Sequence, residues 1–236
     1  LELRCHAEEI GAFRHAPSPP FRILHSLPSF AERDAYVRSL YGLYGAVSFT
    51  GWANRFLTER DLGKGDFKGA KVVVVPDARR VSDGTFAALA AFADKGGTVL
   101  VDGREALTKD QWGKIVPSRK TALGKFRLFA DASSKSRFAA LADALTEKGV
   151  VPPLDLRTSS GGRPFGIMWR TARTSAGEDV AFIANLSRET VELSVPGCWN
   201  DVLGGGASVP SALKMKPLDL IVMKAARPAG VQSIGK

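Results

Sequence analysis

The sequence predicts an α/β protein whose first domain is built on a parallel sheet and whose second domain is a small antiparallel β structure. Three observations predict this: four consecutive valines at residues 72–75, a helical period after them, and a second apolar run at residues 99–101. A strand, a helix and a strand within about thirty residues form a right-handed crossover, which makes the two strands parallel. After about residue 150 this alternation stops.

The valine run is the clearest element. The run is too short to form a helix of its own. Its β-branched side chains suit a strand that is buried on both faces. Ser82 can cap the next helix and Asp83 lies in its first turn, and apolar residues then recur at helical spacing until Gly96 and Gly97 end it. We therefore predict that the two middle valines, at positions 73 and 74, are fully buried in a central strand.

The other elements of the first domain follow in chain order. Residues 1–20 are expected to form a connector, with a helix at 2–15 and an extended proline-rich linker at 17–20. Residues 25–30 are expected as a loop, and the segment after residue 103 as irregular structure. Further strands are predicted at 21–24, 54–58 and 125–129, and further helices at about 32–47 and 134–148. Five strands alternating with helices predict a flavodoxin-like doubly wound sheet over residues 21–150.

The second domain has a different pattern. Short or alternating apolar runs are separated by proline and glycine turns, and no helical period appears. We expect a small antiparallel β domain at 160–226, a boundary near 150–162 and a tail at 227–236. Its clearest strands are predicted at 166–170, 180–184, 191–195 and 218–223.

The formal charge of +9 is spread along the chain. Residues 1–150 carry 23 Lys and Arg against 17 Asp and Glu, and the remainder carries 10 against 7. The one concentration, at 104–127, has seven basic residues without a stacking pattern of aromatic side chains. A solvated face or linker is the favoured interpretation there, and we expect no nucleic-acid partner.

Membrane and metal sites are also not expected. No stretch approaches the roughly twenty apolar residues that span a bilayer, and no signal peptide opens the chain, so we expect a soluble chain in an undetermined compartment. The chain begins at Leu1 without methionine, which we interpret as the exit of a longer polypeptide. Cys5 and Cys198 lack C-x-x-C spacing, so a structural zinc site is not expected, and two reduced thiols are favoured over a disulfide.

Candidate catalytic residues are sparse. The segment between the valine strand and its helix lacks a glycine-rich nucleotide-binding fingerprint, so no cofactor is expected. Of the three histidines, only His25 follows a predicted strand at the edge where open α/β sheets bind ligands, and a surface or capping role is favoured for it. The other two are His6 and His15.

Acidic residues follow several predicted strands. Glycosidic bond cleavage needs two carboxyl groups about 5 to 10 Å apart, and strand ends could bring such a pair together. Loop acids are common in any soluble protein, however, so we predict no catalytic residue in this chain. The four candidates weighed are Glu59, Asp61, Asp77 and Asp102.

Several segments together resemble a known family. They are 21–51 (beginning FRILHSLPSF), TERDL at 58–62, 72–110 (beginning VVVVPDARR), VAFIANLSRETVEL at 180–193, WNDVLGG at 199–205 and LKMKPLDLIVMK at 213–224. These segments resemble the β-galactosidase trimerisation domain, a glutamine-amidotransferase-like α/β module, followed by the small β domain that closes such barrel glycoside hydrolases. The resemblance covers 21–115 and, less closely, 166–224, without a single diagnostic motif.

The resemblance implies a supporting role. In that family both catalytic glutamates lie on an upstream barrel of about 250 residues, for which this chain has no room. The implied function is thus a noncatalytic oligomerisation and scaffold region, trimeric in the full-length enzyme, with the carbohydrate substrate bound by the missing barrel. The helix at 2–15 would be the connector leaving that barrel.

Two alternatives stay open. A stand-alone amidotransferase-like hydrolase would need a nucleophilic cysteine near residues 101–104, where Asp102 stands instead, with neither cysteine nearby. A carbohydrate-binding or sensory module would use Trp169 or Trp199 to stack on a sugar ring, although tryptophan in a small β domain is more often part of the core.

Overall fold

The computed structural model describes residues 5–32 and 34–226. The chain divides into two compact units. We call Ser18–Val151 the α/β unit, and Leu1–Pro17 together with Pro152–Lys236 the β unit. The segment before residue 18 therefore belongs with the β unit, although it precedes the α/β unit in the chain.

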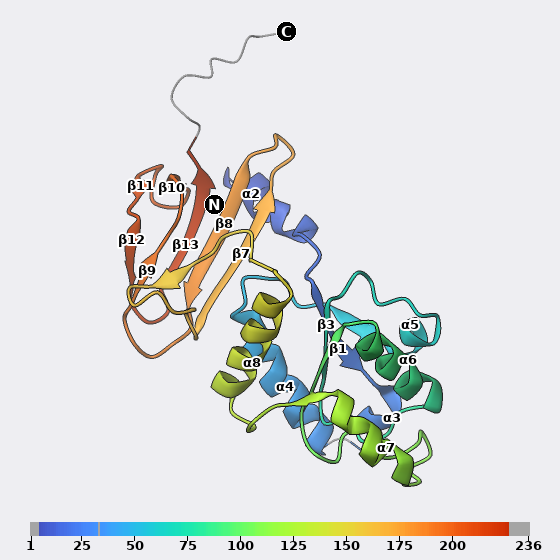
Figure 1. Ribbon diagram of the computed structural model, residues 1–236. Helices are drawn as coiled ribbons and strands as arrows, with labels where there is room; N and C mark the ends of the chain where they lie inside the picture. The colour runs from blue at the N-terminus through green and yellow to red at the C-terminus, as the bar shows by residue number, and fades with distance from the viewer. Residues whose placement is uncertain (1–4, 33, 227–236) are drawn as a thin grey trace. The chain divides into compact units, whose positions relative to one another are not determined.

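The α/β unit contains a five-stranded parallel sheet in the order β2-β1-β3-β4-β5 (Figure 1). This is the flavodoxin-like order, and it confirms the predicted fold class. The strands are β1 (Phe21–His25), β2 (Phe56–Thr58), β3 (Val72–Val75), β4 (Thr98–Val101) and β5 (Arg127–Leu128).

Strand β3 lies at the centre of the sheet. All four of its valines are fully buried. Val74 is paired with Ile23 of β1 on one side and with Leu100 of β4 on the other, so no edge of the strand meets solvent. The predicted burial of Val73 and Val74 is confirmed.

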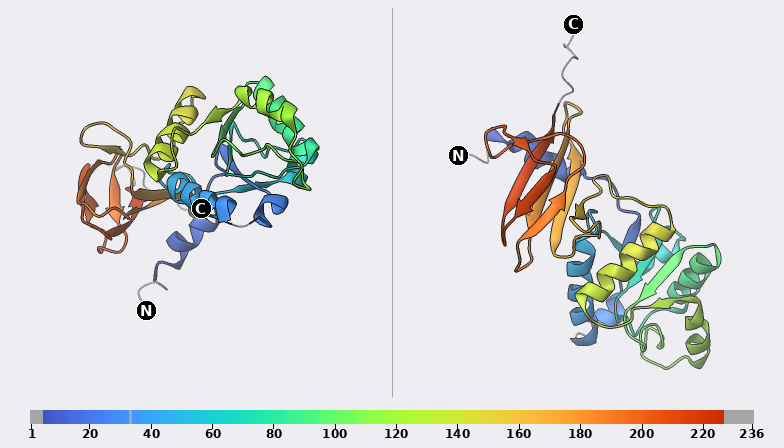
Figure 2. Two further views of the ribbon diagram at one scale, coloured as in Figure 1. Left: turned by 90° about the horizontal axis from the view of Figure 1, so that it is seen from below. Right: turned by 60° about the vertical axis from the view of Figure 1, so that its left-hand side comes forward.

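Helices cover both faces of this sheet (Figure 2). On one face, α4 (Asp34–Ser48) and α8 (Ser134–Glu147) bury leucines against Phe21 and Val74. On the other face, α5 (Glu59–Gly63) and α6 (Asp83–Asp94) pack on a cluster that includes Val73 and Val75. The Ser82 hydroxyl accepts the Thr85 N–H at 3.1 Å, which confirms the predicted helix cap.

Short elements differ from the sequence prediction. The expected loop at 25–30 contains a helical turn, α3 (Leu27–Phe30), because the Ser26 hydroxyl accepts the Ser29 N–H and caps it. The expected irregular basic segment contains α7 (Pro117–Ala122), which starts with a proline that suits a first helical turn. Strands β2 and β5 are shorter than predicted, and a 3₁₀ turn, η2 (Leu123–Lys125), replaces the start of the latter.

The β unit is made of two antiparallel sheets, in the orders β11-β10-β13-β8-β7 and β12-β9-β6. The four predicted strands correspond to β7 (Ile167–Arg173), β8 (Asp179–Asn185), β9 (Val191–Ser194) and β13 (Leu220–Ala225). Four shorter strands were missed: β6 (Arg157–Thr158), β10 (Trp199–Asp201), β11 (Ser208–Val209) and β12 (Ala212–Met215). A small antiparallel β structure after the α/β fold is thus confirmed.

The N-terminal segment contains α2 (Ala7–Ala12) and a 3₁₀ turn, η1 (Phe13–His15). Phe13 contacts Phe182 of β8 edge to face, with ring centroids 5.1 Å apart, which fastens this segment to the β unit. Helix 2–15 was predicted as one element, but its last turn is 3₁₀. Residues 1–4 and the predicted tail at 227–236 lie outside the described residues.

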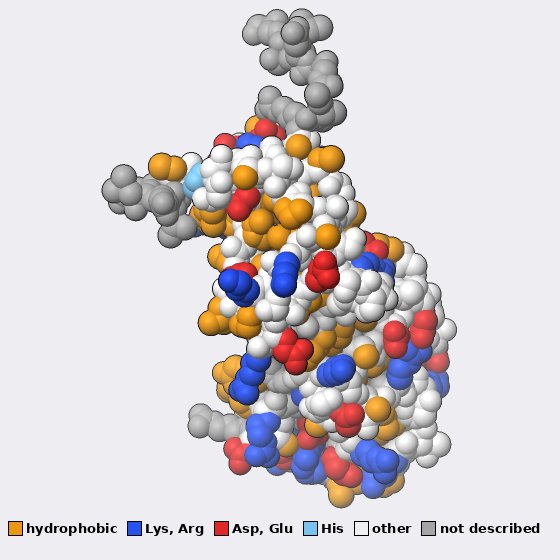
Figure 3. All heavy atoms as spheres, turned by 90° about the vertical axis from the view of Figure 1, so that its left-hand side faces the viewer, with side chains coloured by type: hydrophobic (Ala, Val, Ile, Leu, Met, Phe, Trp, Pro, Cys, Tyr) orange, Lys and Arg blue, Asp and Glu red, His pale blue; other side chains and the backbone are white. Residues whose placement is uncertain are grey.

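The surface carries both signs of charge. On the face drawn in Figure 3, basic and acidic side chains alternate and do not gather into one patch of a single sign. Across the described part of the chain, no helix combines the length and apolar character that crossing a bilayer requires.

Candidate functional site

The carboxyl ends of the parallel strands gather the acidic residues that the sequence singled out. Glu59 follows β2, Asp77 follows β3 after one proline, and Asp102 follows β4 directly. In an open α/β sheet this edge is where ligands bind. The chemistry that this edge of the sheet can support depends on the groups that contact each carboxylate.

Asp102 is held by two elements that cover the sheet. It is 5% exposed, and its Oδ2 lies 2.5 Å from Nη2 of Arg137 on α8. The Ser39 hydroxyl on α4 donates a second short hydrogen bond to the same oxygen. By binding the buried Arg137 guanidinium and the Ser39 hydroxyl, the Asp102 carboxylate connects the end of β4 to α8 and α4. This role is structural.

Asp77 lies beside Asp102 and is also paired. Arg79 contacts it from two residues away, with Nη2 to Oδ2 at 3.0 Å and Nε to both carboxylate oxygens at 3.2 Å. The Asp77 N–H donates to the same Ser39 hydroxyl at 2.9 Å, so Ser39 links the two aspartates. The carboxylate of Asp77 raises the pKa of the Arg79 guanidinium by accepting its hydrogen bonds.

Both aspartates line a hollow of about 440 Å³. Its other walls include three guanidinium groups, of Arg38, Arg79 and Arg137. Two of these three are neutralised by the aspartates. The sequence prediction placed the acids at one edge correctly, but their partners argue against a pair that shuttles protons or attacks a sugar, because each carboxylate is already bound by an arginine of the chain.

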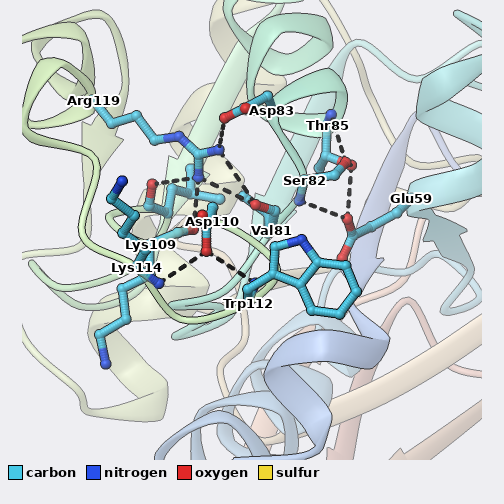
Figure 4. A network of polar contacts seen from close by, with 11 residues as sticks. Glu59, Val81, Ser82, Asp83, Thr85, Lys109, Asp110, Trp112, Lys114 and Arg119 are labelled. Carbon is cyan, nitrogen blue, oxygen red and sulfur yellow. Dashed lines mark hydrogen bonds and ion pairs between the residues drawn. The ribbon is translucent and has the colours of Figure 1, made fainter.

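Glu59 connects the loop after β1 to the start of α6 through hydrogen bonds. Its carboxylate accepts hydrogen bonds from the Ser26 hydroxyl at 2.6 Å, the Thr85 hydroxyl at 2.8 Å and the Ser82 N–H at 3.2 Å. Figure 4 shows it pointing at the first turn of α6. It therefore ties the ends of β1 and β2 to the start of that helix.

Asp61 caps its own helix. It accepts hydrogen bonds from the Thr58 N–H at 3.0 Å and the Thr58 hydroxyl at 2.7 Å, and Thr58 in turn accepts the Asp61 N–H. These hydrogen bonds lower the pKa of Asp61. Such a capping box satisfies the first N–H groups of α5.

The histidines and cysteines do not complete a catalytic arrangement. His25 lies between Phe30 and Phe56, with ring centroids 6.2 and 6.3 Å away, at the edge of the sheet. His6 and His15 belong to the β unit, as do Cys5 and Cys198, which are exposed thiols. Among the described residues no group of three or more His, Cys, Asp or Glu side chains could hold a metal ion.

Arg119 is the organising residue that sequence reasoning missed. Although it belongs to the basic segment expected to be solvated, it is 3% exposed. Its guanidinium donates to the carbonyl oxygens of Val81, Leu107 and Lys109 and pairs with Asp83 at 2.5 Å (Figure 4). It thereby joins the loop after β4 to the loop after β3, and nothing in its local pattern signals that burial.

The two tryptophans considered for sugar binding differ. Trp169 is 2% exposed and its indole N–H donates to the Leu154 carbonyl at 2.9 Å, so it belongs to the core of the β unit, as the favoured interpretation had it. Trp199 is half-buried and lines a hollow.

Comparisons with known proteins indicate where this fold occurs. No protein-family model and no curated protein sequence matches the chain. Solved structures do match. The chain superposes on a GH42 exo-carrageenase from Bacteroides ovatus with a TM-score of 0.68 at 19% identity, over 94% of this chain and 31% of that one.

Two β-galactosidases give similar results. The E323A catalytic mutant of Gan42B, a GH42 β-galactosidase from G. stearothermophilus, matches with a TM-score of 0.66 at 13% identity, over 90% of this chain and 41% of its own. The β-galactosidase from Bacillus circulans sp. alkalophilus matches with a TM-score of 0.61 at 14% identity, over 88% and 41%. The chain therefore has the fold of part of such glycoside hydrolases and spans 31–41% of their length.

Proposed function

We propose that this chain is a noncatalytic region of a β-galactosidase-like glycoside hydrolase. The observation that carries the proposal is the extent of the match: 94% of this chain, with both of its units, corresponds to 31% of the exo-carrageenase. On this proposal, chemistry on the carbohydrate belongs to a catalytic barrel outside the chain, as the family resemblance implies.

The edge of the parallel sheet supports the noncatalytic part of the proposal. Asp77 and Asp102 are ion-paired with arginines, and Glu59 is engaged by three hydrogen bonds. We expect the purified chain to hydrolyse no aryl-galactoside above the buffer rate. Turnover that copurifies with the chain and disappears in Asp77→Asn or Asp102→Asn would refute this.

The α/β unit is proposed as an assembly surface. Three large apolar side chains of the edge strand β2 and of α3, the helical turn that follows the neighbouring strand β1, are exposed: Leu27 by 71%, Phe30 by 42% and Phe56 by 44%. We call these three residues the β2-edge cluster. An exposed apolar group beside an unpaired sheet edge supports contact with another subunit, and a cyclic oligomer needs such a patch on every copy.

The oligomer proposed is a homotrimer of the full-length enzyme. Light scattering should give three times the mass of one chain for the longer enzyme, and the mass of one chain after deletion of residues 21–150. A full-length enzyme that is monomeric at micromolar concentration, or a deletion variant that is still trimeric, would remove the scaffold role.

The amidotransferase-like alternative has no specific observation in its favour. The position of the expected nucleophile is taken by Asp102, a buried carboxylate paired with Arg137. The sugar-binding alternative is different, because Trp199 lies in a hollow with polar side chains.

A further inference from the structure

A hollow at one end of the β unit joins an aromatic side chain to polar ones. It measures about 410 Å³, within the range of roughly 300–1,000 Å³ that small-molecule sites occupy. Trp199 of β10, Arg173 of β7 and Asp179 of β8 line it together with Thr171 and His15. All of these residues belong to the β unit, so the hollow is complete within it.

The strand register explains how these side chains meet. Arg173 is paired with Asp179, and Trp199 is paired with Ala225 of β13. Because Lys224 is paired with Val180, continuing the register by one residue puts Ala225 opposite Asp179. The four residues form one row across β10, β13, β8 and β7, and residues opposite each other in antiparallel strands share a face.

This row leaves room for a ring. Adjacent strands lie about 4.8 Å apart, so Trp199 and Asp179, two strands from each other, are separated by about 10 Å. Ala225, the residue of this row that lies between them, has only a methyl group as its side chain. An indole and a charged pair, about two strand spacings apart, thus border the same hollow.

Trp199 is fixed as a platform. Its indole N–H donates to the Pro196 carbonyl at 2.8 Å, and a Cβ on Gly197 would come within 3.2 Å of the same nitrogen. The indole packs against the core of the β unit while the side chain stays half-buried. Its orientation is therefore set before any ligand arrives, which reduces the entropy lost on binding.

The opposite wall offers hydrogen bonds without net charge. Arg173 Nε donates to Asp179 Oδ1 at 2.9 Å, and the two side chains are 68% and 53% exposed. The hydrogen bond to Asp179 raises the pKa of Arg173, so the guanidinium stays charged at neutral pH. Together they present N–H donors and carboxylate acceptors to a ligand, and their charges cancel.

We infer that this hollow binds a neutral saccharide, with the apolar face of one pyranose ring on Trp199 and ring hydroxyls on Arg173 and Asp179. The aromatic face matches the C–H side of a pyranose, and the donor and acceptor pair matches its hydroxyl groups. The paired charges favour a neutral sugar over a sulfated one. This inference goes beyond the scaffold role and does not depend on it, since the site lies in the β unit and needs neither a barrel nor an oligomer.

Calorimetric titration of the purified chain with galactose, lactose and a sulfated carrageenan oligosaccharide tests the inference. Galactose or lactose should bind saturably, with one site per chain. Trp199→Ala should weaken that binding by up to about tenfold, the upper range for loss of one stacked aromatic contact. Trp112→Ala is the matched control because Trp112 is 82% exposed in the other unit, and it should bind like the wild type.

A second variant keeps the test independent of folding. Arg173→Ala changes an exposed side chain, so it should keep the melting temperature within a few degrees and still weaken binding. The inference is wrong if the wild-type chain binds neither neutral sugar, if it binds only the sulfated oligosaccharide, or if Arg173→Ala and a folded Trp199→Ala bind as the wild type does.

Discussion

At the scale of single residues, the buried Asp102–Arg137 pair gives the sharpest prediction. Arg137→Ala should lower the free energy of unfolding by about 3–5 kcal/mol, because it leaves a buried carboxylate without its counterion. Urea denaturation followed by circular dichroism measures this. The control is Arg127→Ala, whose pair with Glu147 is 44% and 51% exposed and should contribute at most about 1 kcal/mol. Equal losses in the two variants would contradict a stabilising role for the buried pair.

Substitutions at two glycines of α4 provide a second test of the Asp102–Arg137 pair. A Cβ on Gly42 would lie 2.0 Å from Nη1 of Arg137, whereas a Cβ on Gly45 would meet nothing within 4 Å. Alanine is favoured over glycine inside a helix by roughly 1 kcal/mol. Gly45→Ala should therefore raise the melting temperature and Gly42→Ala should lower it, since Arg137 must leave Asp102. A rise in both variants would show that Arg137 moves aside without loss.

The candidate site was predictable only in part. Strand ends indicated that Asp77 and Asp102 would share an edge, because carboxyl ends of parallel strands meet there. Their chemistry depends on Ser39, 63 positions from Asp102, and on Arg137, 35 positions from it. Contacts at such separations arise from packing of α4 and α8, which a single sequence does not reveal. Arg119 was missed for the same reason.

At the scale of elements, strength of pattern decided what could be predicted. The valine strand is recognised as a continuous apolar run. The long helices α4, α6 and α8 repeat their apolar period often enough to be recognised. Short helices such as α3 and α7, and two-residue strands such as β5 and β11, have too few residues to show a period. They are stabilised by caps and by tertiary contacts instead. Even in the long helix α4, apolar character does not decide burial at every position, since Tyr44 is 47% exposed.

The central strand gives the prediction at this scale. Val74→Asp would put a charge at a fully buried position between β1 and β4, at a cost of several kcal/mol, and should unfold the α/β unit. Far-ultraviolet circular dichroism and the melting temperature report this. Val151→Asp is the control, because Val151 is 60% exposed, and it should leave both unchanged. A folded Val74→Asp variant would mean that the strand is not central.

At the scale of the whole molecule, each unit has its own core and its own candidate surface. The α/β unit has two aspartates paired with arginines at the edge where such folds bind ligands, and the exposed β2-edge cluster. The β unit has the hollow at Trp199. Because the charges of the chain itself occupy the edge where this fold binds ligands, we propose assembly as the role of the outer surface.

The β2-edge cluster can therefore be tested as the subunit contact of the longer enzyme. Leu27→Glu places a charge at a position that is 71% exposed in the chain, so it should not disturb folding, yet it would be desolvated in an interface. Sedimentation velocity should show the variant as monomers at a concentration where the parent enzyme is trimeric. Leu218→Glu is the matched control, since Leu218 is 82% exposed in the β unit, and it should stay trimeric. If Leu27→Glu stays trimeric and Leu218→Glu dissociates, the contact lies on the β unit and the proposed cluster is wrong.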